Sequence, residues 1–534
     1  MTFKPEHLFF WLFGSLALIL AILICSFPFV AGTPISRQPE ISATPFLPSS
    51  EVIGSTQALA GKPTQNYQPV FKGAPCTFPL PSGYSPECGY LVVPESWSHP
   101  DGRLIQLHVA IFRSKAAAPA PDPVVHLAGG PGSSSLDTAR YLFGQGLSAI
   151  LERRDFILFD QRGTGYSQPR LDCPERNALT PQLLDGSLSD DGASRAIVEA
   201  FRRCRDRLVS EGIDLASYTS TASAADINAL RLALGYDQLN LYGDSYGTRL
   251  ALTVMRDFPQ AARSVVLDST YPLEVNLYTT LAPNAERAFN VLFDECAADP
   301  GCNSSYPDLR GIFYNLVDQL NNSPRKLSLA VGGNNYSILL NGNLLIDTLF
   351  GGLYNPAVTA SMPKMISQIQ QGEYAILRER LRLYFDTSSA LGMGTSVQCA
   401  EEVPFGSAEA VQNAAQGVQP AIAALFSKSN QYLFTICPDW SGQAADPREN
   451  KPVTSDIPTL ILAGEGDPIT PPAWGQMTAA HLSRASFYEF RGQGHWVTRS
   501  SRCALSMALA FWDDPTATPE SSCIQTQGSL YFAP

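Results

Sequence analysis

The sequence predicts an α/β protein with a mostly parallel sheet, covered by helices on both faces and interrupted by a largely helical insertion. Short runs of continuous hydrophobicity alternate with helical stretches, which is the pattern of parallel strands buried on both faces. Helical periodicity dominates residues 272–440, and the strand pattern returns after them. We therefore expect a core in two parts, residues 73–271 and 441–534, with residues 272–440 as a cap.

The expected elements follow in chain order. The first two strands, residues 89–94 and 104–113, are predicted to form an antiparallel hairpin. The later strands are predicted at residues 124–128, 156–159, 239–242, 264–267, 458–463 and 485–490. The core helices are predicted at residues 139–152, 221–234, 248–258, 473–482 and 501–511, and the cap helices at residues 286–298, 309–320, 357–370, 374–384 and 408–427.

The N-terminal segment has the pattern of an export signal. After Lys4, an uncharged apolar run covers residues 8–24 and resumes to residue 30. The run is close to a membrane-spanning length, so an uncleaved anchor through residues 8–30 stays open as an alternative. We expect residues 1–32 to be a signal peptide or membrane anchor, and the protein to be secreted or extracytoplasmic. Residues 33–72 are rich in Pro, Ser, Thr and Gln and are predicted to form a disordered spacer.

Charge and cysteine content narrow the class of protein. The chain has 37 Lys and Arg against 49 Asp and Glu, a formal net charge of −12 with no basic patch, which argues against nucleic-acid binding. Eleven cysteines occur; Cys25 lies in the signal, where the large Ile24 argues against lipidation. The other ten predict five disulfides in an oxidising compartment. The simplest pairing joins neighbours: Cys76 with Cys88, Cys173 with Cys204, Cys296 with Cys302, Cys399 with Cys437, and Cys503 with Cys523.

No metal or cofactor is implied by the sequence. Zinc binding is the rival explanation for the cysteines, but no Cys-x-x-Cys pair or Cys/His cluster supports it.

The stretch around residues 239–248 carries the first chemical motif. Gly243-Asp244-Ser245-Tyr246-Gly247 fits G-x-S-x-G, after an apolar strand and before a helix. Strand, tight turn and helix together predict a nucleophile elbow with Ser245 at its apex, where only small residues fit on either side. The pattern by itself is weak, because a glycine-rich strand-to-helix turn without chemistry has the same letters.

Two further residues give the motif its context. Ser245, Asp467 and His495 each follow the C-terminal end of a predicted strand, and ligands of open parallel sheets gather at that edge. Their order is that of the Ser, Asp and His of α/β-hydrolases. A hydroxyl, a base that takes its proton and an anion that orients the base are the groups that acyl transfer needs.

The assignment of the base and the acid rests on elimination. His495 lies on a glycine-flanked loop, whereas the other histidines fall in less suitable places: His7 in the signal, His99 in a turn, His108 and His126 in strands, and His481 in a helix. Asp268, which follows the preceding strand, is the alternative acid, and the Gly-Asp-Pro turn at Asp467 favours Asp467.

The glycine-rich turn at residues 129–132 is the expected oxyanion loop. Pro131 has no N–H and cannot donate, so the amide of Gly130 is the predicted donor, together with the amide of Tyr246.

These residues resemble the α/β-hydrolase superfamily, and more narrowly the proline iminopeptidase and tripeptidyl aminopeptidase group of serine peptidases, in the secreted branch with a TAP-like C-terminal region. The matching motifs are residues 129–132, 160–167 and 243–247 and the Asp467 and His495 loops, within residues 75–525. The Asp-Gln-Arg-Gly-Thr-Gly-Tyr-Ser run at 160–167 is the most specific of them. Ala128 departs from the family, in which many members have His before the glycines.

The resemblance implies an α/β-hydrolase fold and the release of short N-terminal pieces, from a single residue to a tripeptide, through an acyl-enzyme. The partner would be a peptide with a free N-terminus, whose α-ammonium is bound by carboxylates of the cap. Glu401 and Glu402 are the local candidates, with solvated surface residues as the alternative. Arg162 is expected to brace its own loop. The alternative functions are an esterase or lactonase acting on small acyl substrates, and an inactive fold that serves as a surface binding protein.

Overall fold

The computed structural model describes residues 67–532. The predicted signal or anchor and all but the end of the predicted spacer lie outside the described residues. Within residues 67–532, no helix is both long enough and apolar enough to cross a membrane.

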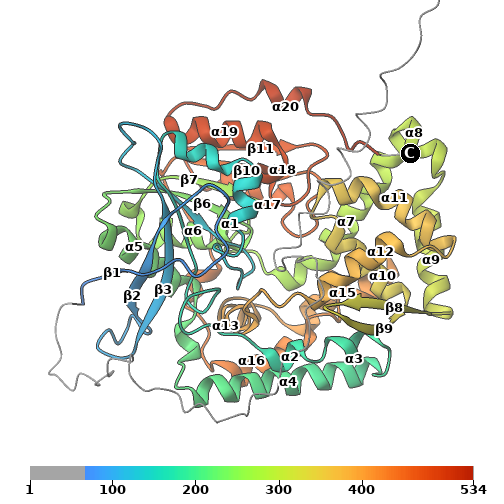
Figure 1. Cartoon of the computed structure of the whole chain (residues 1–534). Coiled ribbons are helices and arrows are strands. Elements are labelled where there is room, and N and C mark those ends of the chain that lie inside the picture. Colours follow the sequence, from blue (N-terminus) through green and yellow to red (C-terminus); the bar gives the residue numbers. More distant parts are fainter. Residues whose placement is uncertain (1–66, 533–534) are drawn as a thin grey trace, which may run out of the picture. The chain divides into compact units, whose positions relative to one another are not determined.

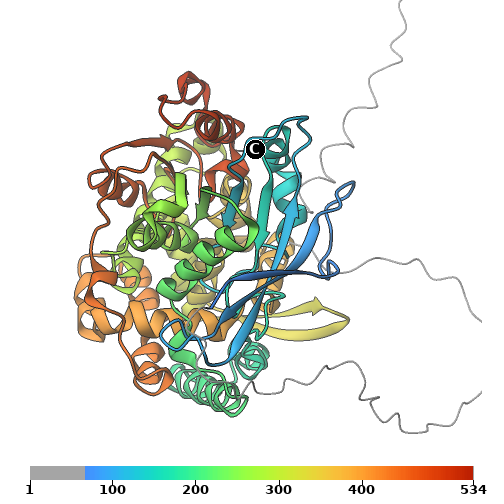
Figure 2. The same cartoon turned by 90° about the vertical axis from the view of Figure 1, so that its left-hand side faces the viewer.

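A nine-stranded sheet forms the core, in the order β1-β2-β3-β5-β4-β6-β7-β10-β11. The first three pairs in this order, β1–β2, β2–β3 and β3–β5, are antiparallel. The remaining pairs, β5–β4, β4–β6, β6–β7, β7–β10 and β10–β11, are parallel. This mostly parallel sheet confirms the predicted fold class. The antiparallel strands lie at one edge (Figure 2). The strands are β1 (Val70–Gly73), β2 (Glu87–Pro94), β3 (Leu104–Phe112), β4 (Val124–Leu127), β5 (Phe156–Phe159), β6 (Leu239–Asp244), β7 (Ala262–Asp268), β10 (Thr459–Gly464) and β11 (Ala485–Phe490).

The end of the predicted spacer is part of this sheet. Residues 70–72 were expected to be disordered, but they belong to β1 and pair in antiparallel register with β2. The Phe71 ring packs against the hydrophobic core and so gives this short edge strand an apolar contact. The polar composition of the preceding segment gave no indication of this contact.

Helices cover both faces of the sheet because its buried strands present apolar side chains alternately to each side. One face is covered by α5 (Ser220–Leu234), α6 (Tyr246–Asp257) and α17 (Pro472–Ala479), and the other by α1 (Ala139–Gly144), η1 (Leu147–Glu152) and α19 (Arg502–Asp513). The helix predicted at 139–152 is broken at Gly146, whose φ of 97° ends α1 before η1 begins. Shorter core elements are η2 (Leu215–Ser217), η3 (Pro259–Ala261), η6 (Pro447–Asn450), α18 (Val497–Ser500) and α20 (Ser522–Thr526).

The cap lies beside the ends of the parallel strands, at the side of the sheet that carries their carboxyl termini, and it has a hydrophobic core of its own (Figure 1). The helix predicted at 408–427 is two helices, separated by Gly417 at φ 83°. The elements of the cap are α7 (Leu277–Ala298), α8 (Pro300–Ser305), α9 (Leu309–Asn322), β8 (Arg325–Val331), β9 (Asn334–Leu340), α10 (Gly342–Gly352), α11 (Pro356–Gln370), α12 (Ala375–Leu381), η4 (Arg382–Phe385), α13 (Leu391–Glu401), η5 (Val403–Phe405), α14 (Ala408–Ala414), α15 (Pro420–Phe426) and α16 (Gln431–Trp440).

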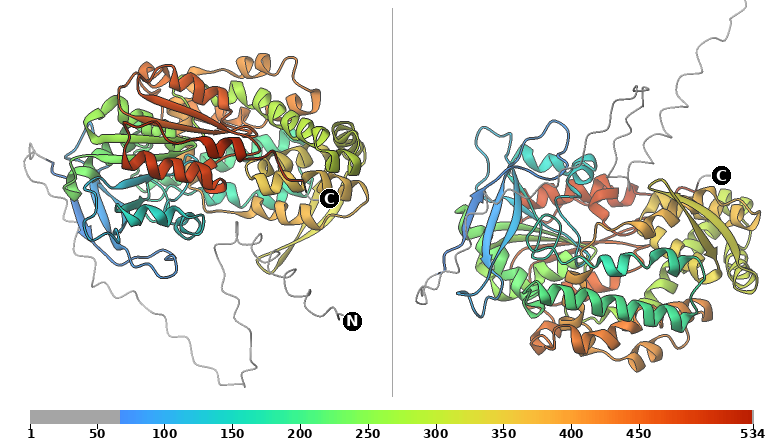
Figure 3. Two further views of the ribbon diagram at one scale, coloured as in Figure 1. Left: turned by 90° about the horizontal axis from the view of Figure 1, so that it is seen from above. Right: turned by 60° about the horizontal axis from the view of Figure 1, so that its bottom comes forward.

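A second insertion, between β5 and β6, joins the cap and was not anticipated. It contains α2 (Pro174–Asn177), α3 (Thr180–Leu184) and the 21-residue α4 (Asp190–Ser210), which lies along α16 (Figure 3). Phe201 of α4 stacks on Tyr432 and meets Trp440 edge-on. The cap is therefore assembled from two separate stretches of chain.

The ten cysteines of the described chain pair in sequence order as five disulfides. Three of the disulfides lie in the cap: Cys173–Cys204 joins the start of α2 to α4, Cys296–Cys302 joins α7 to α8, and Cys399–Cys437 joins α13 to α16. Such a set of disulfides is typical of an oxidising, extracytoplasmic environment.

Candidate active site

Ser245 occupies the turn between β6 and α6 with a backbone that few residues adopt. Its φ is 55° and its ψ −124°, and its amide donates to the carbonyl of Asp268 at 3.0 Å. A side chain on Gly243 would overlap the carbonyl of Gly247, and one on Gly247 would overlap the carbonyl of Leu127. Both glycines are therefore required by backbone packing, and the strained serine between them is the geometry of a nucleophile elbow.

His495 and Asp467 form a buried pair at the ends of β11 and β10. His495 Nδ1 lies 2.7 Å from Asp467 Oδ2, and both residues are at most 2% exposed. Asp467 Oδ1 accepts the amides of Ile469 at 3.0 Å and Thr470 at 2.9 Å, and the Thr470 hydroxyl donates to Oδ2 at 2.7 Å. Burial raises the pKa of Asp467, but the charge of His495 and these hydrogen bonds outweigh it and lower the pKa overall.

The other nitrogen of His495 is available for chemistry. Among the described residues, His495 Nε2 is buried and has no hydrogen-bond partner. With Nδ1 held by Asp467, the imidazole can take up a proton at Nε2 and share the resulting charge with a carboxylate, which is the task of a general base.

Asp268, the alternative acid, serves a different segment. Its carboxylate accepts the amides of Val497 at 2.7 Å and Thr498 at 2.9 Å, and the Thr498 hydroxyl at 2.5 Å. Asp268 thus anchors the start of α18, directly after His495, and does not bond the imidazole. Burial raises the pKa of Asp268. The geometry therefore favours Asp467 as the partner of His495.

The glycine-rich loop after β4 lies against Ser245. A side chain on Gly129 would come within 2.9 Å of Ser245 Cβ. The Gly129 amide already donates to Asp244 Oδ1 at 3.0 Å, whereas the amides of Gly130 and Tyr246 donate to no other described residue. Those two amides are consequently the ones left for an oxyanion.

The run at 160–167 holds this loop from both sides. Gln161 Nε2 donates to the carbonyl of Ala128 at 2.8 Å, just before the glycines. Asp160 accepts the Ser134 hydroxyl at 2.8 Å and the Leu136 amide at 3.2 Å, just after them. Burial raises the pKa of Asp160 to about 6.

Arg162, by contrast, braces more distant parts of the core. Its guanidinium pairs with Asp226 of α5 at 2.7 Å and donates to the carbonyls of Glu95 and Ser217, each at 2.6 Å. It is fully buried, so it does not face a substrate.

His126 is buried, as its strand position suggests, but it is part of a charged cluster. His126 Nε2 lies 2.7 Å from Asp244 Oδ2, and Arg499 of α18 pairs with the same carboxylate. Burial raises the pKa of Asp244, but the charges of Arg499 and His126 outweigh it and bring the pKa to about 2. Asp244 therefore joins the oxyanion loop, the elbow and the His495 segment.

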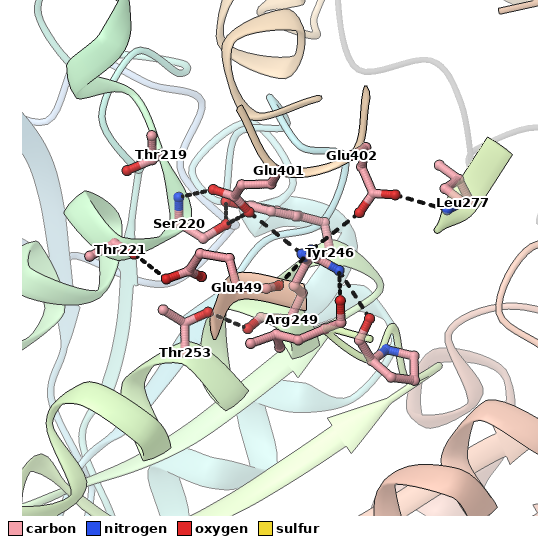
Figure 4. A network of polar contacts seen from close by, with 12 residues as sticks. Thr219, Ser220, Thr221, Tyr246, Arg249, Thr253, Leu277, Glu401, Glu402 and Glu449 are labelled. Carbon is pink, nitrogen blue, oxygen red and sulfur yellow. Dashed lines mark hydrogen bonds and ion pairs between the residues drawn. The ribbon is translucent and has the colours of Figure 1, made fainter. Parts of the chain in front are cut away.

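Glu401 and Glu402 are buried at the end of α13, so the interpretation of them as solvated cap residues is wrong (Figure 4). Glu401 accepts the amide of Ser220 at 2.6 Å and its hydroxyl at 2.7 Å, and lies 3.5 Å from Arg249 Nε. Glu402 accepts the amide of Leu277 at 2.9 Å, and its Oε1 lies 3.2 Å from Arg249 Nη2. Burial raises the pKa of both carboxyls.

The surroundings of Glu402 are buried and polar. Glu402 Oε1 has an ion-pair contact to Arg249 at 3.2 Å, and the Tyr271 hydroxyl lies within hydrogen-bonding reach of the same carboxylate. The Tyr278 hydroxyl has no hydrogen-bond partner within residues 67–532. Both tyrosines lie close enough to Glu402 for its charge to raise the pKa of their hydroxyls further above the level set by burial. The Tyr278 hydroxyl therefore keeps hydrogen-bonding capacity that no residue within 67–532 fills.

Several of these residues were not anticipated, though the sequence contains traces of them. Thr470 stands three residues after Asp467, the spacing at which a hydroxyl caps its own turn. Arg249 stands one helical turn after Ser245, as a charge on a helix that is otherwise buried. Asp244 is an acidic residue at the end of β6, a strand whose residues are all buried. The partners of Arg249 and Asp244 are remote in sequence, so only folding reveals those contacts.

The strand order, the elbow and the Ser, Asp and His positions together define a serine hydrolase of the α/β-hydrolase type. A family model described as the alpha/beta hydrolase fold matches residues 122–327, and one described as TAP-like protein matches residues 423–523. The chain therefore has the α/β-hydrolase fold and carries a TAP-like C-terminal region.

Relatives agree with this class. The chain is 26% identical over 463 residues to serine protease Hip1 of Mycobacterium tuberculosis, covering 82% of this chain and 86% of that relative. It is 32% identical over 191 residues to the tripeptidyl aminopeptidase of Streptomyces coelicolor, covering 34% of this chain and 35% of that relative. It is also 27% identical over 466 residues to carboxylesterase B of Mycobacterium tuberculosis, covering 81% and 85%.

Proposed function

We propose that the protein is an exported aminopeptidase that releases short N-terminal pieces from peptides. Ser245 attacks the scissile carbonyl while His495 Nε2 takes the hydroxyl proton and Asp467 holds the imidazole. The amides of Gly130 and Tyr246 stabilise the oxyanion of the tetrahedral intermediate. His495 then gives the proton to the leaving amine, an acyl-enzyme forms, and water activated by His495 hydrolyses it.

The observation that carries the peptide proposal is the buried Glu402, whose Oε1 has an ion-pair contact to Arg249 at 3.2 Å but no aligned hydrogen bond. A substrate's α-ammonium would donate to this oxygen and to the Tyr278 hydroxyl, which has no partner within residues 67–532. Glu401 suits the same role less well, because its two oxygens are already bonded to Ser220. The proposal therefore gives the ammonium to Glu402 and a structural role to Glu401.

The length of α13 supports a tripeptide as the released piece. The helix starts at the oxyanion loop, where the Ala390 amide donates to the Gly132 carbonyl at 3.0 Å and Gly394 packs on Pro131. From Gly394 to Glu402 is eight residues, about 12 Å along a helix. Three extended residues span about 10 Å, whereas one spans about 3.5 Å. A tripeptide product fits this spacing best.

The proposal is tested by product analysis on paired substrates. Matched hexapeptides with free and with N-acetylated termini are incubated with the wild-type protein and with Ser245→Ala, and the products are identified by mass spectrometry. We expect tripeptides from the free peptides, at least tenfold lower kcat/KM for the acetylated ones, and no product with Ser245→Ala. Equal kcat/KM for both members of each pair would overturn the aminopeptidase assignment.

An esterase acting on small acyl substrates is the second candidate. The long match to carboxylesterase B favours it, because that match covers 81% of the chain, against 82% for the protease. Short-chain acyl esters without an amine decide between the two. If they are hydrolysed with kcat/KM equal to or above that of free tripeptidyl substrates, the esterase assignment replaces the peptidase one. Loss of fluorophosphonate labelling in Ser245→Ala excludes an inactive binding protein.

A further inference from the structure

We propose that Glu401, Glu402 and Arg249, here called the carboxylate network, gate catalysis electrostatically. With the amine site empty, the network leaves one negative charge behind the oxyanion donor Tyr246 and opposes formation of the oxyanion. A substrate's ammonium cancels that charge. The inference rests on the proposed function and extends it, because it makes the free amine act on kcat and not only on binding.

The network is joined to the side chain of Tyr246, whose amide is the proposed oxyanion donor, through Ser220. Tyr246, the predicted second donor, bonds through its hydroxyl to Ser220 Oγ at 2.8 Å, and Ser220 Oγ donates to Glu401 Oε2 at 2.7 Å. One serine therefore separates the carboxylate from Tyr246 (Figure 4). Arg249 lies on the same helix as Tyr246, one turn further on, so both sides of the network contact the nucleophile's helix.

The charges in this region do not balance. The side chains of Glu401, Glu402 and Arg249 are each at most 4% exposed, so water screens them little. Arg249 is the guanidinium that both carboxylates contact. It also donates to the carbonyls of Pro272, Leu273 and Glu449 at 3.0 to 3.3 Å and lies over the Tyr271 ring, 4.9 Å from its centroid, and none of these groups is a charged carboxylate. Two carboxylates against one guanidinium leave one negative charge.

The neighbouring ionic groups are balanced among themselves and do not supply the missing cation. Glu449 pairs with Arg256 at 2.5 Å and accepts the Thr221 hydroxyl at 2.7 Å. Asp257 pairs with the same Arg256 at 2.7 Å and with Arg448 at 3.7 Å. This second group therefore has two carboxylates and two guanidiniums.

Backbone hydrogen bonds and Arg249 favour the charged form of each carboxyl. The Ser220 amide that binds Glu401 opens α5, and the Leu277 amide that binds Glu402 opens α7. Helix N-termini favour anions. Burial works in the opposite direction and raises the pKa of each carboxyl. A bound ammonium removes that conflict, because it pairs with the carboxylate that lacks a full partner.

The first test is Glu402→Gln, which keeps the shape of the side chain and removes the excess charge. For an N-acetylated substrate we expect kcat to rise on the order of tenfold, the effect of one unit charge about 10 Å away at an effective dielectric constant of about 20. For the matched free-amine substrate, kcat/KM falls. An unchanged or lower kcat on the acetylated substrate, in protein that titrates as fully active, overturns the gate.

The matched control is Glu409→Gln, an exposed carboxylate of α14 in the same cap. It makes the same change in charge and leaves both substrates at their wild-type rates. A rise on the acetylated substrate in this variant would assign the effect to net charge and overturn the gate.

A second test needs no substitution in the network. Methylammonium chloride added to the wild-type protein should fill the amine site and raise kcat on the acetylated substrate in a saturable way, while potassium chloride at equal ionic strength does not. Glu402→Gln should not respond. Absence of any stimulation overturns the gate. If the wild type shows no preference for free amines at all, the aminopeptidase proposal itself fails; if it shows the preference but neither test succeeds, only the gate fails.

Discussion

The backbone amide of His495 donates to the carbonyl of Tyr354 at 2.9 Å, and the Tyr354 ring meets the imidazole edge-on with centroids 4.9 Å apart. Tyr354 belongs to the cap, in the turn between α10 and α11. Arg287 of α7 makes a parallel connection, because its guanidinium donates to the carbonyls of Glu465 and Asp467. The cap therefore supports the loops of both the base and the acid, in addition to covering the site.

Tyr354→Ala is expected to lower kcat about tenfold to a hundredfold with little change in KM. The backbone bond to His495 survives, but the ring that limits the motion of the imidazole is lost, and small misplacements of a catalytic group have effects of this size. Steady-state kinetics on a free-amine peptide measure the effect. Tyr531→Ala, which truncates an aromatic residue that is 84% exposed, is the control and should match the wild type. A higher KM at constant kcat would contradict this role.

Asp467→Asn and Asp268→Asn separate the two buried acids of the site. Asp467→Asn is expected to lower kcat about 10⁴-fold, because the imidazole of His495 loses the carboxylate that sets its tautomer and stabilises its charge. Asp268→Asn should have a far smaller effect on kcat. It should lower the free energy of unfolding by about 1–3 kcal/mol, because it weakens the hydrogen bonds that Asp268 accepts from Val497 and Thr498. Kinetics and denaturant unfolding of both variants check the pair; equal losses of kcat would reject the assignment of Asp467.

Asp244→Asn should destabilise the protein by about 3–5 kcal/mol, because it leaves the buried Arg499 without its carboxylate. The double variant Asp244→Asn with Arg499→Met should recover most of that loss, since no buried charge is then unpaired. The folded pKa of Asp244, about 2, lies below its usual value. Its contribution of about 2 kcal/mol is therefore complete above pH 4 and disappears as the pH falls through 2. Urea unfolding between pH 2 and 7 tests both statements; no recovery in the double variant contradicts the first.

Asp160 should produce the opposite pH dependence. Its folded pKa of about 6 lies above the usual value for aspartate, so the folded state holds the proton more tightly than the unfolded chain. The stabilisation from that proton is complete below about pH 4 and is lost as the pH rises through 6, a change of about 3 kcal/mol. Asp160→Asn removes this slope. If the difference in unfolding free energy between wild type and variant stays constant from pH 4 to 7, the raised pKa is wrong.

Much of the framework could be predicted from local patterns in the sequence. Each apolar strand and the elbow at Ser245 depend on residues that are close together in the chain. Such local patterns, and the order of Ser, Asp and His, can be recognised before the fold is known. The boundaries were less accurate where one glycine decides the outcome, as at Gly146 and Gly417, whose positive φ values end helices that periodicity alone would continue. The helix α4 was missed because its buried face, which includes Phe201, exists only against α16.

The sequence by itself determined the fold class and the chemical groups, because hydrophobic period and turn residues are local properties of the chain. Only the tertiary structure decided their pairing. It brought Asp467 and not Asp268 to His495, set Glu402 apart from Glu401, and joined two distant insertions into one cap. Those outcomes depend on hydrogen bonds and burial between segments that are separated by tens to hundreds of residues. Local sequence patterns do not indicate which of these distant segments will meet.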